Sequence, residues 1–444
     1  MLKVTRSRRD GLYLLLLGTV VFLFLGGIAV NSSRFSMVDF RVVYYSARCL
    51  IEHCDPYQES ELLRTYRAEG GERPSDTADI RQIVTRYIYL PTAFCFTVPF
   101  AMLPWGPAHI LWMMLTVGSL ILASFLVWNL GAEFAPIVSG VLIGFLLANS
   151  VVIVILCNTA GIAVSLCVVA VWCFVREQFV PAGILCLAIS LAVKPQDAGL
   201  VWLYFLLAGG VYRKRALQTL LVIVALSLPA VLWVWRVAPH WMQEWHTNVL
   251  AFSARGGLTD PGPASTGPRT LVDLQVVVSF FRDDPRIYNA VSYLVCASLL
   301  VVWGVVTLRS RSSPARAWLA IAAIAALSML PVYHHLMDTK LLLLTVPACA
   351  MLWAQGGSIG RLALLVNTAG FVLTGDISSA ILLRLIASLH LSSTGLSGQV
   401  QTAVQIFPIP LVLLIMGIFY LCVYVQRSSA PLSAAVTPSG GIRP

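Results

Sequence analysis

Apolar residues along the chain gather into long runs that short polar segments separate. A membrane-crossing helix needs about 20 mostly apolar residues, and the hydropathy of these runs is typical of such helices. We predict an all-α polytopic membrane bundle of about twelve crossings, at about residues 11–31, 108–129, 134–152, 158–175, 179–195, 198–212, 217–236, 289–308, 316–333, 341–355, 358–375 and 405–425.

A thirteenth apolar stretch, residues 90–105, contains Pro91, Pro99 and Pro104 and is short for a crossing. We predict that it lies in the outer interface, because only then do all the basic clusters fall on one side. The inner loops and tails then carry 14 basic and 3 acidic residues, and the other 16 basic and 17 acidic residues lie outside. Since basic loops stay in the cytoplasm, both termini are expected there.

The predicted topology leaves three long outer loops to hold the polar chemistry of the protein, at residues 32–89, 237–288 and 376–404. It divides the chain into a basic cytoplasmic N-terminus (1–10), an N-terminal membrane module with the first outer loop (11–236), the second outer loop (237–288), C-terminal transmembrane helices (289–425) and a cytoplasmic tail (426–444). The tail is rich in Ser, Pro and Gly and is expected to be disordered.

Composition excludes a soluble protein. Apolar residues make up 58% of the 444 positions and charged residues 11%, against about 25% charged in soluble domains. The net charge of +10 therefore indicates topology, and no nucleic-acid partner is expected. Eight of the ten cysteines lie in or beside apolar runs and are expected to act as small hydrophobic residues. Cys49 and Cys54 lie in a polar stretch, where they form a short disulfide only if that stretch faces an oxidising compartment.

Several motifs of nucleotide-driven or metal-dependent enzymes are absent from the sequence: GxxxxGK[ST], GxGxxG after a strand, HExxH, paired CxxC and DxD. We therefore expect neither a metal nor another cofactor. Transporters often carry ionisable residues in the middle of their spans, whereas the polar residues here gather at the outer ends. This placement favours an outward-facing active site.

Asp39 lies just beyond the first predicted crossing, between Val38 and Phe40. An apolar setting raises the pKa of a carboxyl group toward the range useful for a general base. The alternative is structural, because Asp is also a favoured N-cap, here for a helix over residues 40–51.

Seven short motifs in a fixed order resemble glycosyltransferase family 87 over about residues 30–340. They are Asp39-Phe-x-x-Tyr-Tyr-x-Ala, Asp55-Pro-Tyr, Tyr87-x-Tyr-Leu-Pro, Leu103-Pro, Cys157-Asn-Thr-Ala, Ala192-Val-Lys-Pro and Leu330-Pro-Val-Tyr-His-His. Two places depart from the family pattern. Asn158-Thr159 stands where many members have Gly-Gln, and Met337-Asp338-Thr339-Lys340 replaces a segment rich in Trp and His.

The resemblance implies a GT-C fold, a catalytic module within residues 11–236 and a polyprenyl-phosphate-linked sugar donor, with mannosyltransferases among the characterised members. The family's aspartate in the first outer loop maps onto Asp39, which implies a catalytic base. The expected reaction is an inverting transfer of a hexose, mannose in particular, to a lipid or glycan acceptor on the outer face of a bacterial-type inner membrane.

Lys194 ends a predicted span on the outer side and is the expected ligand of the donor phosphate. Its alternatives are snorkelling to lipid headgroups and neutralisation by Asp197. We assign His334 and Arg86 to the donor phosphate as well, although each also suits a structural or anchoring role. Further candidates for acceptor or supporting contacts are Arg41, Tyr89, Asn158, Gln196 and His335.

Two other functions fit many spans and a cationic pocket. A transporter or flippase of a lipid-linked sugar would bind phosphate but would need no general base. A polymerase or ligase of diphospho-linked glycans usually relies on arginines in its outer loops. The role of Asp39 separates the glycosyltransferase from the flippase.

Overall fold

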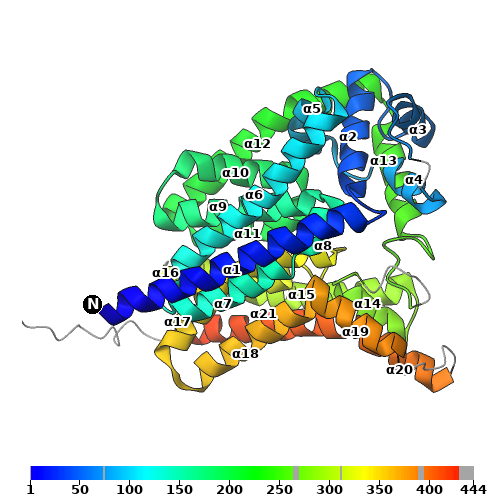
Figure 1. The fold of residues 1–444 in the computed structure, drawn as a ribbon. Helices are drawn as coiled ribbons and strands as arrows, with labels where there is room; N and C mark the ends of the chain where they lie inside the picture. The colour runs from blue at the N-terminus through cyan, green and yellow to red at the C-terminus, as the bar shows by residue number, and fades with distance from the viewer. Residues whose placement is uncertain (1, 74–75, 264–269, 311–312, 389–394, 430–444) are drawn as a thin grey trace, which may run out of the picture.

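The computed structural model describes residues 2–73, 76–263, 270–310, 313–388 and 395–429 (Figure 1). Seven helical segments are long and apolar enough to cross a membrane. They are α1 (Leu2–Ser32, apolar from Arg6), α6 (Trp105–Gly131), α9 (Thr159–Arg176), α12 (Gly210–Val237), α15 (Pro285–Arg309), η2 with α17 (Leu336–Thr345 and Val346–Gln355) and α21 (Pro408–Ser429).

An eighth crossing is possible where α18 (Gly357–Leu373) and α19 (Asp376–Ser388) meet at a bend of 67°. The expectation of an all-α membrane protein holds for the described residues, but the count of twelve crossings is not confirmed. The remaining predicted spans form shorter helices, namely α7 (Pro136–Ala148), α8 (Val151–Leu156), α10 (Val180–Val193), α11 (Pro195–Ala208) and α16 (Pro314–Leu327).

The short helices explain the difference. α7, α10, α11 and α16 have 13 or 14 residues each, or about 20 Å of helix, against a hydrocarbon core of about 30 Å. Hydropathy counted each apolar run as one crossing, but a backbone break at Asn149 divides the run 134–152, and the break at Lys194 separates two helices that are each too short to cross. α16 is instead buried by its neighbours, with every side chain from Ala317 to Leu327 inside.

Residues 90–105 form η1 (Pro91–Ala93) and α5 (Phe94–Ala101). The two pieces together have 11 residues, about 16 Å of helix, which is too short to cross a bilayer. Their placement outside the set of spans stays a prediction.

Glycines bring α1 and α7 into close contact. A Cβ on Gly18 would lie 2.3 Å from the carbonyl oxygen of Gly144, and one on Gly140 would lie 2.1 Å from that of Gly11. Only hydrogen fits at these crossings, so the backbones pack directly against each other, as small residues allow in membrane bundles. This contact fixes the helix that leads to Asp39.

The predicted outer loops contain further helices. The first holds α2 (Val38–Ile51), α3 (Glu59–Ala68) and α4 (Ala78–Val84), the second α13 (Trp241–Ser253) and α14 (Leu274–Phe281), and the third α19 and α20 (Gly395–Ile406). The third segment is therefore mostly helical in its described part. Of the predicted tail, residues 430–444 lie outside the described residues.

The Cys49–Cys54 disulfide is formed at the C-terminal end of α2, which decides the question that the sequence left open. Aromatic side chains pack α2 against its neighbours, with the Phe40 ring stacked on Trp112 at 4.8 Å and the Tyr45 ring on Trp105 at 5.7 Å. The first outer segment is thus a packed unit on the bundle.

The first helix begins at the end of the bundle where the N-terminus lies (Figure 1), and basic residues near several helix ends make contacts between helices. The Arg8 guanidinium lies 5.8 Å from the Trp128 ring, Arg215 donates to Phe174 O at 2.6 Å, and Arg316 donates to Arg427 O at 3.1 Å. The charge count places these basic residues on one side of the membrane, and that side stays a prediction.

Candidate active site

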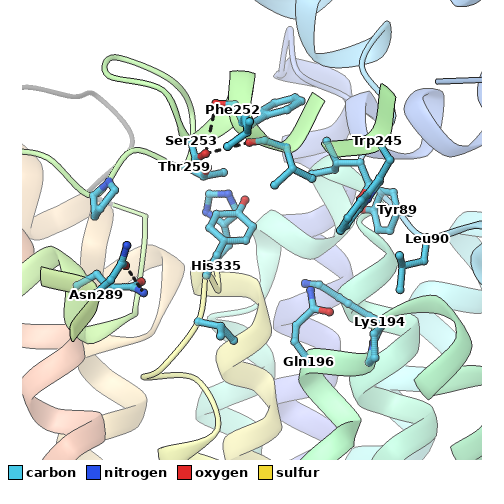
Figure 2. A pocket seen from close by; sticks show the side chains of 18 of the residues that line it. Tyr89, Leu90, Lys194, Gln196, Trp245, Phe252, Ser253, Thr259, Asn289 and His335 are labelled. Carbon is cyan, nitrogen blue, oxygen red and sulfur yellow. Dashed lines mark hydrogen bonds between the residues drawn. The ribbon is translucent and has the colours of Figure 1, made fainter. Parts of the chain in front are cut away.

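A cavity of about 700 Å³ lies at the other end of the bundle, between the outer segments and the helix ends (Figure 2). Its wall combines the loop before η1, the α10–α11 junction, α13, the start of α15 and residues 332–337. Polar and aromatic groups line it: Tyr89, Asn158, Lys194, Gln196, Trp245, Ser253, Thr259, Gln275, Tyr288, Asn289, Tyr293, Tyr333 and His335.

Several of the residues that line the cavity are exposed, namely Pro195, Leu250, Ser253, Ala254, Pro285, Tyr293 and Val332. Leu250 of α13 is 53% exposed and Tyr293 of α15 is 47% exposed, although both contribute to the pocket wall. The cavity is therefore open to the surface of the molecule beside these residues.

Asp39 lies in the first turn of α2; it is not among the residues that line the cavity, and it contacts the wall through Asn158. The N-cap of α2 is Met37 in the left-handed region, with φ of 61°, and its backbone N–H donates to Ile155 O at 2.7 Å. Asp39 is consequently not the N-cap that the structural alternative required. Its Oδ2 accepts a hydrogen bond of 2.7 Å from Nδ2 of Asn158, a residue on the pocket wall.

Asn158 holds this contact in one orientation. It is the N-cap of α9, and its Oδ1 accepts from the backbone N–H of Ala160 at 2.7 Å. With Oδ1 occupied by the cap, the amide nitrogen must face the carboxylate of Asp39.

Burial raises the pKa of Asp39 to about 6, since an ionised carboxylate loses water contacts there. The hydrogen bond from Asn158 and the charge of Lys194 oppose this rise, and the charge of Asp338 adds to it. A carboxylate in this range is largely ionised at neutral pH and still basic enough to take a proton from a hydroxyl group.

Lys194 lies on the pocket wall, 8% exposed, at the break between α10 and α11. It is not a free cation. Its Nζ donates to Asp338 Oδ1 and lies 3.6 Å from Asp197 Oδ2. Asp338 also accepts from the backbone N–H of His335 at 2.7 Å.

The pairing with Asp338 was missed at the sequence level, because 144 positions separate the two residues. A weak signal was present, since Asp338 lies close to the apolar run at 341–355, where an acidic group needs a partner. Neutralisation by Asp197 was one of the expected alternatives, and the structure contains that contact too.

The sequence assigned His334 to the donor phosphate and His335 to a supporting contact, but only His335 reaches the cavity. His334 has an exposed fraction of 0%, and its Nε2 lies 3.3 Å from Asp197 Oδ1, so it does not reach the cavity. His335 lines the cavity instead, and Figure 2 shows its ring between Asn289 and Lys194. A donor bound in this pocket would meet His335.

Both arginine candidates are engaged elsewhere. Arg86 forms an ion pair of 3.1 Å with Glu59, and Arg41 is buried in an ion pair of 3.1 Å with Asp76. Neither lines the cavity, whereas the predicted residues Tyr89, Asn158 and Gln196 do. The Tyr89 hydroxyl accepts from Thr159 Oγ1 at 3.0 Å.

One described group has the spacing of a metal site, Cys49 with Cys54 and Glu61. The two sulfur atoms are joined in the disulfide and are not available as ligands. Chemically, the pocket region offers a carboxylate that can take a proton and an ammonium group that can hold an anion.

Comparison with known families matches residues 87–333 to glycosyltransferase family 87. Comparisons with curated proteins and with solved structures gave no match. The matched segment covers more than half of the chain and contains Tyr89, Asn158 and Lys194, while Asp39 precedes it and His335 follows it. The chain belongs to glycosyltransferase family 87 and is a glycosyltransferase.

Proposed function

We propose that the protein transfers a hexose, specifically mannose, from a polyprenyl-phosphate donor to a lipid or glycan acceptor on the outer face of a bacterial-type inner membrane. The observation that carries this proposal is the Asp39–Asn158 pair beside a pocket whose wall includes Lys194. The proposed base contacts the cavity wall through Asn158, and the proposed cation is part of that wall.

The reaction is an inverting single displacement that needs no metal ion. The acceptor hydroxyl loses its proton to Asp39 and attacks C1 of the donor sugar. The C1–O bond to phosphate breaks, and the phosphate monoester leaves with its electron pair. Because this leaving group is already an anion, the enzyme has to stabilise charge there without protonating it.

Lys194 is the phosphate ligand in this mechanism. Its pairing with Asp338 and Asp197 orients the ammonium group, and one of its three N–H donors is assigned to the phosphate. His335, on the same wall, is a second contact for the donor.

Replacing Asp39 by Asn tests the proposal, because the amide keeps the size of the side chain and cannot accept the proton. Purified full-length protein in proteoliposomes is given polyprenyl-phosphate-[14C]mannose and octyl α-D-mannoside as the acceptor. We expect wild-type transfer, and a fall of about 10² to 10⁴ in kcat for Asp39→Asn. The matched control is Asp79→Asn, an exposed carboxylate in the first turn of α4, which should leave kcat unchanged.

Three outcomes would contradict the proposal. Near-normal turnover by Asp39→Asn would show that Asp39 is not the general base. Transfer from a nucleotide sugar, and not from the lipid-linked sugar, would contradict the proposed class of donor. Movement of the donor across the bilayer without transfer would indicate a flippase.

A further inference from the structure

We propose that the α14–α15 end of the pocket is the acceptor subsite and that it binds an uncharged carbohydrate. This inference rests on the proposed function and names the acceptor class for the same site. Its central feature is a pair of amide side chains, Gln275 of α14 and Asn289 of α15, on the wall opposite Lys194 (Figure 2).

The amide pair has a fixed orientation. Gln275 Nε2 donates to Asn289 Oδ1 at 3.1 Å and to Pro331 O at 3.3 Å. Both N–H groups of Gln275 are thereby used, which leaves its Oε1 as an acceptor and the Asn289 Nδ2 as a donor. A donor and an acceptor side by side match a sugar hydroxyl, which gives one hydrogen bond and takes another.

Charge within the cavity is concentrated at the opposite end. Among the described lining residues Lys194 is the one with a permanent charge, and Asp338 and Asp197 already pair with it. An anionic headgroup at the amide end would lose its hydration without meeting a cation, which is costly. A neutral glycan has no such cost.

Aromatic side chains complete the subsite. Tyr288 and Tyr293 of α15 lie on the same wall as Asn289, and the Tyr333 ring meets the His335 ring at 4.9 Å. Flat apolar faces beside amide groups suit the C–H faces and hydroxyl edges of a sugar ring. His335 stands between this end and Lys194, so an acceptor held here would present a hydroxyl toward the donor side (Figure 2).

Binding to Asn289→Ala tests the subsite independently of transfer. Purified full-length protein in nanodiscs is titrated with octyl α-D-mannoside as the acceptor probe and with decyl phosphate as the donor-end probe, using tryptophan fluorescence. We expect the Kd for octyl mannoside to rise about tenfold and the Kd for decyl phosphate to stay within about twofold. Gln243→Ala, an exposed amide on α13, is the matched control and should change neither.

A charged probe tests the acceptor class. Octyl glucuronide should bind wild-type protein at least about tenfold more weakly than octyl mannoside, because its carboxylate meets no cation. If Asn289→Ala does not fold, Asn289→Ser keeps an oxygen for Gln275 and should show the same loss.

Unchanged mannoside binding in a folded variant would overturn the subsite. Loss of decyl phosphate binding instead would assign the amide end to the donor, and equal binding of the glucuronide would overturn the uncharged class. If the proposed transfer reaction is wrong, the assay with the labelled donor shows no transfer. The binding measurements do not depend on transfer, so they still test the subsite.

Discussion

Asp39 owes its chemistry to its surroundings. An aspartate at this position suits a helix N-cap, but Met37 is the N-cap of α2. The carboxylate of Asp39 instead accepts a hydrogen bond from Asn158. Burial then raises its pKa to about 6. If Asp39 is the base of the proposed mechanism, its protonation controls activity in the weakly acidic range.

We expect kcat/KM to fall about tenfold per pH unit below pH 6, because protonated Asp39 cannot act as a base. Above pH 7 the carboxylate is ionised and the profile should be flat. Steady-state rates measured between pH 4.5 and 8 give this acidic limb of the pH profile, the decrease of kcat/KM below pH 6. Asn158→Ala removes a hydrogen bond that lowers the pKa, so the limb should move to higher pH. A constant rate from pH 5 to pH 7 would contradict the assignment.

Lys194 needs a different test, because two buried carboxylates depend on it. Lys194→Met removes the ammonium group that both carboxylates contact, and losing one partner of a buried ion pair costs about 3–5 kcal/mol. We expect a lower Tm together with a donor KM raised about ten- to a hundredfold. In Lys194→Met/Asp338→Asn the Tm should recover while the donor KM stays high. Recovery of both would make the lysine purely structural.

Tyr89, Asn158, Lys194 and Gln196, which the sequence placed at the ends of apolar runs on one side, line one cavity, and their roles there stay a prediction. The sequence could not separate His334 from His335. Adjacent residues point to different sides, and which side faces the cavity depends on packing against Asp197, which is far away in the sequence.

Helix α1 (Leu2–Ser32) leads to α2, which carries Asp39, and the glycines of α1 have different roles. Gly18 packs directly against α7, whereas a Cβ on Gly27 would meet nothing within 4 Å. Apolar composition is the same at both positions, so hydropathy does not distinguish them.

Gly18→Ala should therefore destabilise the protein by about 1–3 kcal/mol, because the new methyl group overlaps the backbone of Gly144. Gly27→Ala is the matched control and should be neutral or stabilising by up to about 1 kcal/mol. Thermal unfolding of the purified protein in detergent compares the two. An equal Tm for both variants would mean that α1 and α7 are not in close contact.

The short helices mark the limit of prediction at this scale. Hydropathy located nearly every apolar helix, because burial in lipid and burial in protein both require apolar side chains. It could not tell α16, which is enclosed by other helices, from a helix that crosses the bilayer beside lipid. Hydropathy likewise gives no information about the direction of a helix, so it did not predict the bend of 67° between α18 and α19.

At the scale of the whole molecule, the N-terminus and the candidate active site are far apart. The N-terminus lies at one end of the bundle, and α2, α13 and α14, which carry the disulfide or line the cavity, lie at the other end (Figure 1). The charge count predicted this separation because it depends only on alternating helix directions. A disulfide also requires an oxidising compartment, which agrees with an outward-facing cavity.

Cysteine labelling tests the orientation. Lys214→Cys, on the predicted cytoplasmic side, should react with a membrane-impermeant maleimide only after cells are permeabilised, and Gln58→Cys, exposed beside α3, should react in intact cells. Labelling of position 214 in intact cells would reverse the topology, and residues 90–105 would then have to cross the bilayer.

The opening of the cavity beside Leu250 and Tyr293 has a consequence under the proposed function, because it changes what concentration means for a lipid-linked donor. A donor whose isoprenoid tail stays in the bilayer approaches such an opening by diffusing in two dimensions. The quantity that governs saturation is then a surface density, the mole fraction of donor among the surrounding lipids. Expanding the membrane with inert lipid would slow the enzyme even when the number of donor molecules per cell is constant, so membrane growth itself becomes a control on the rate of glycosylation.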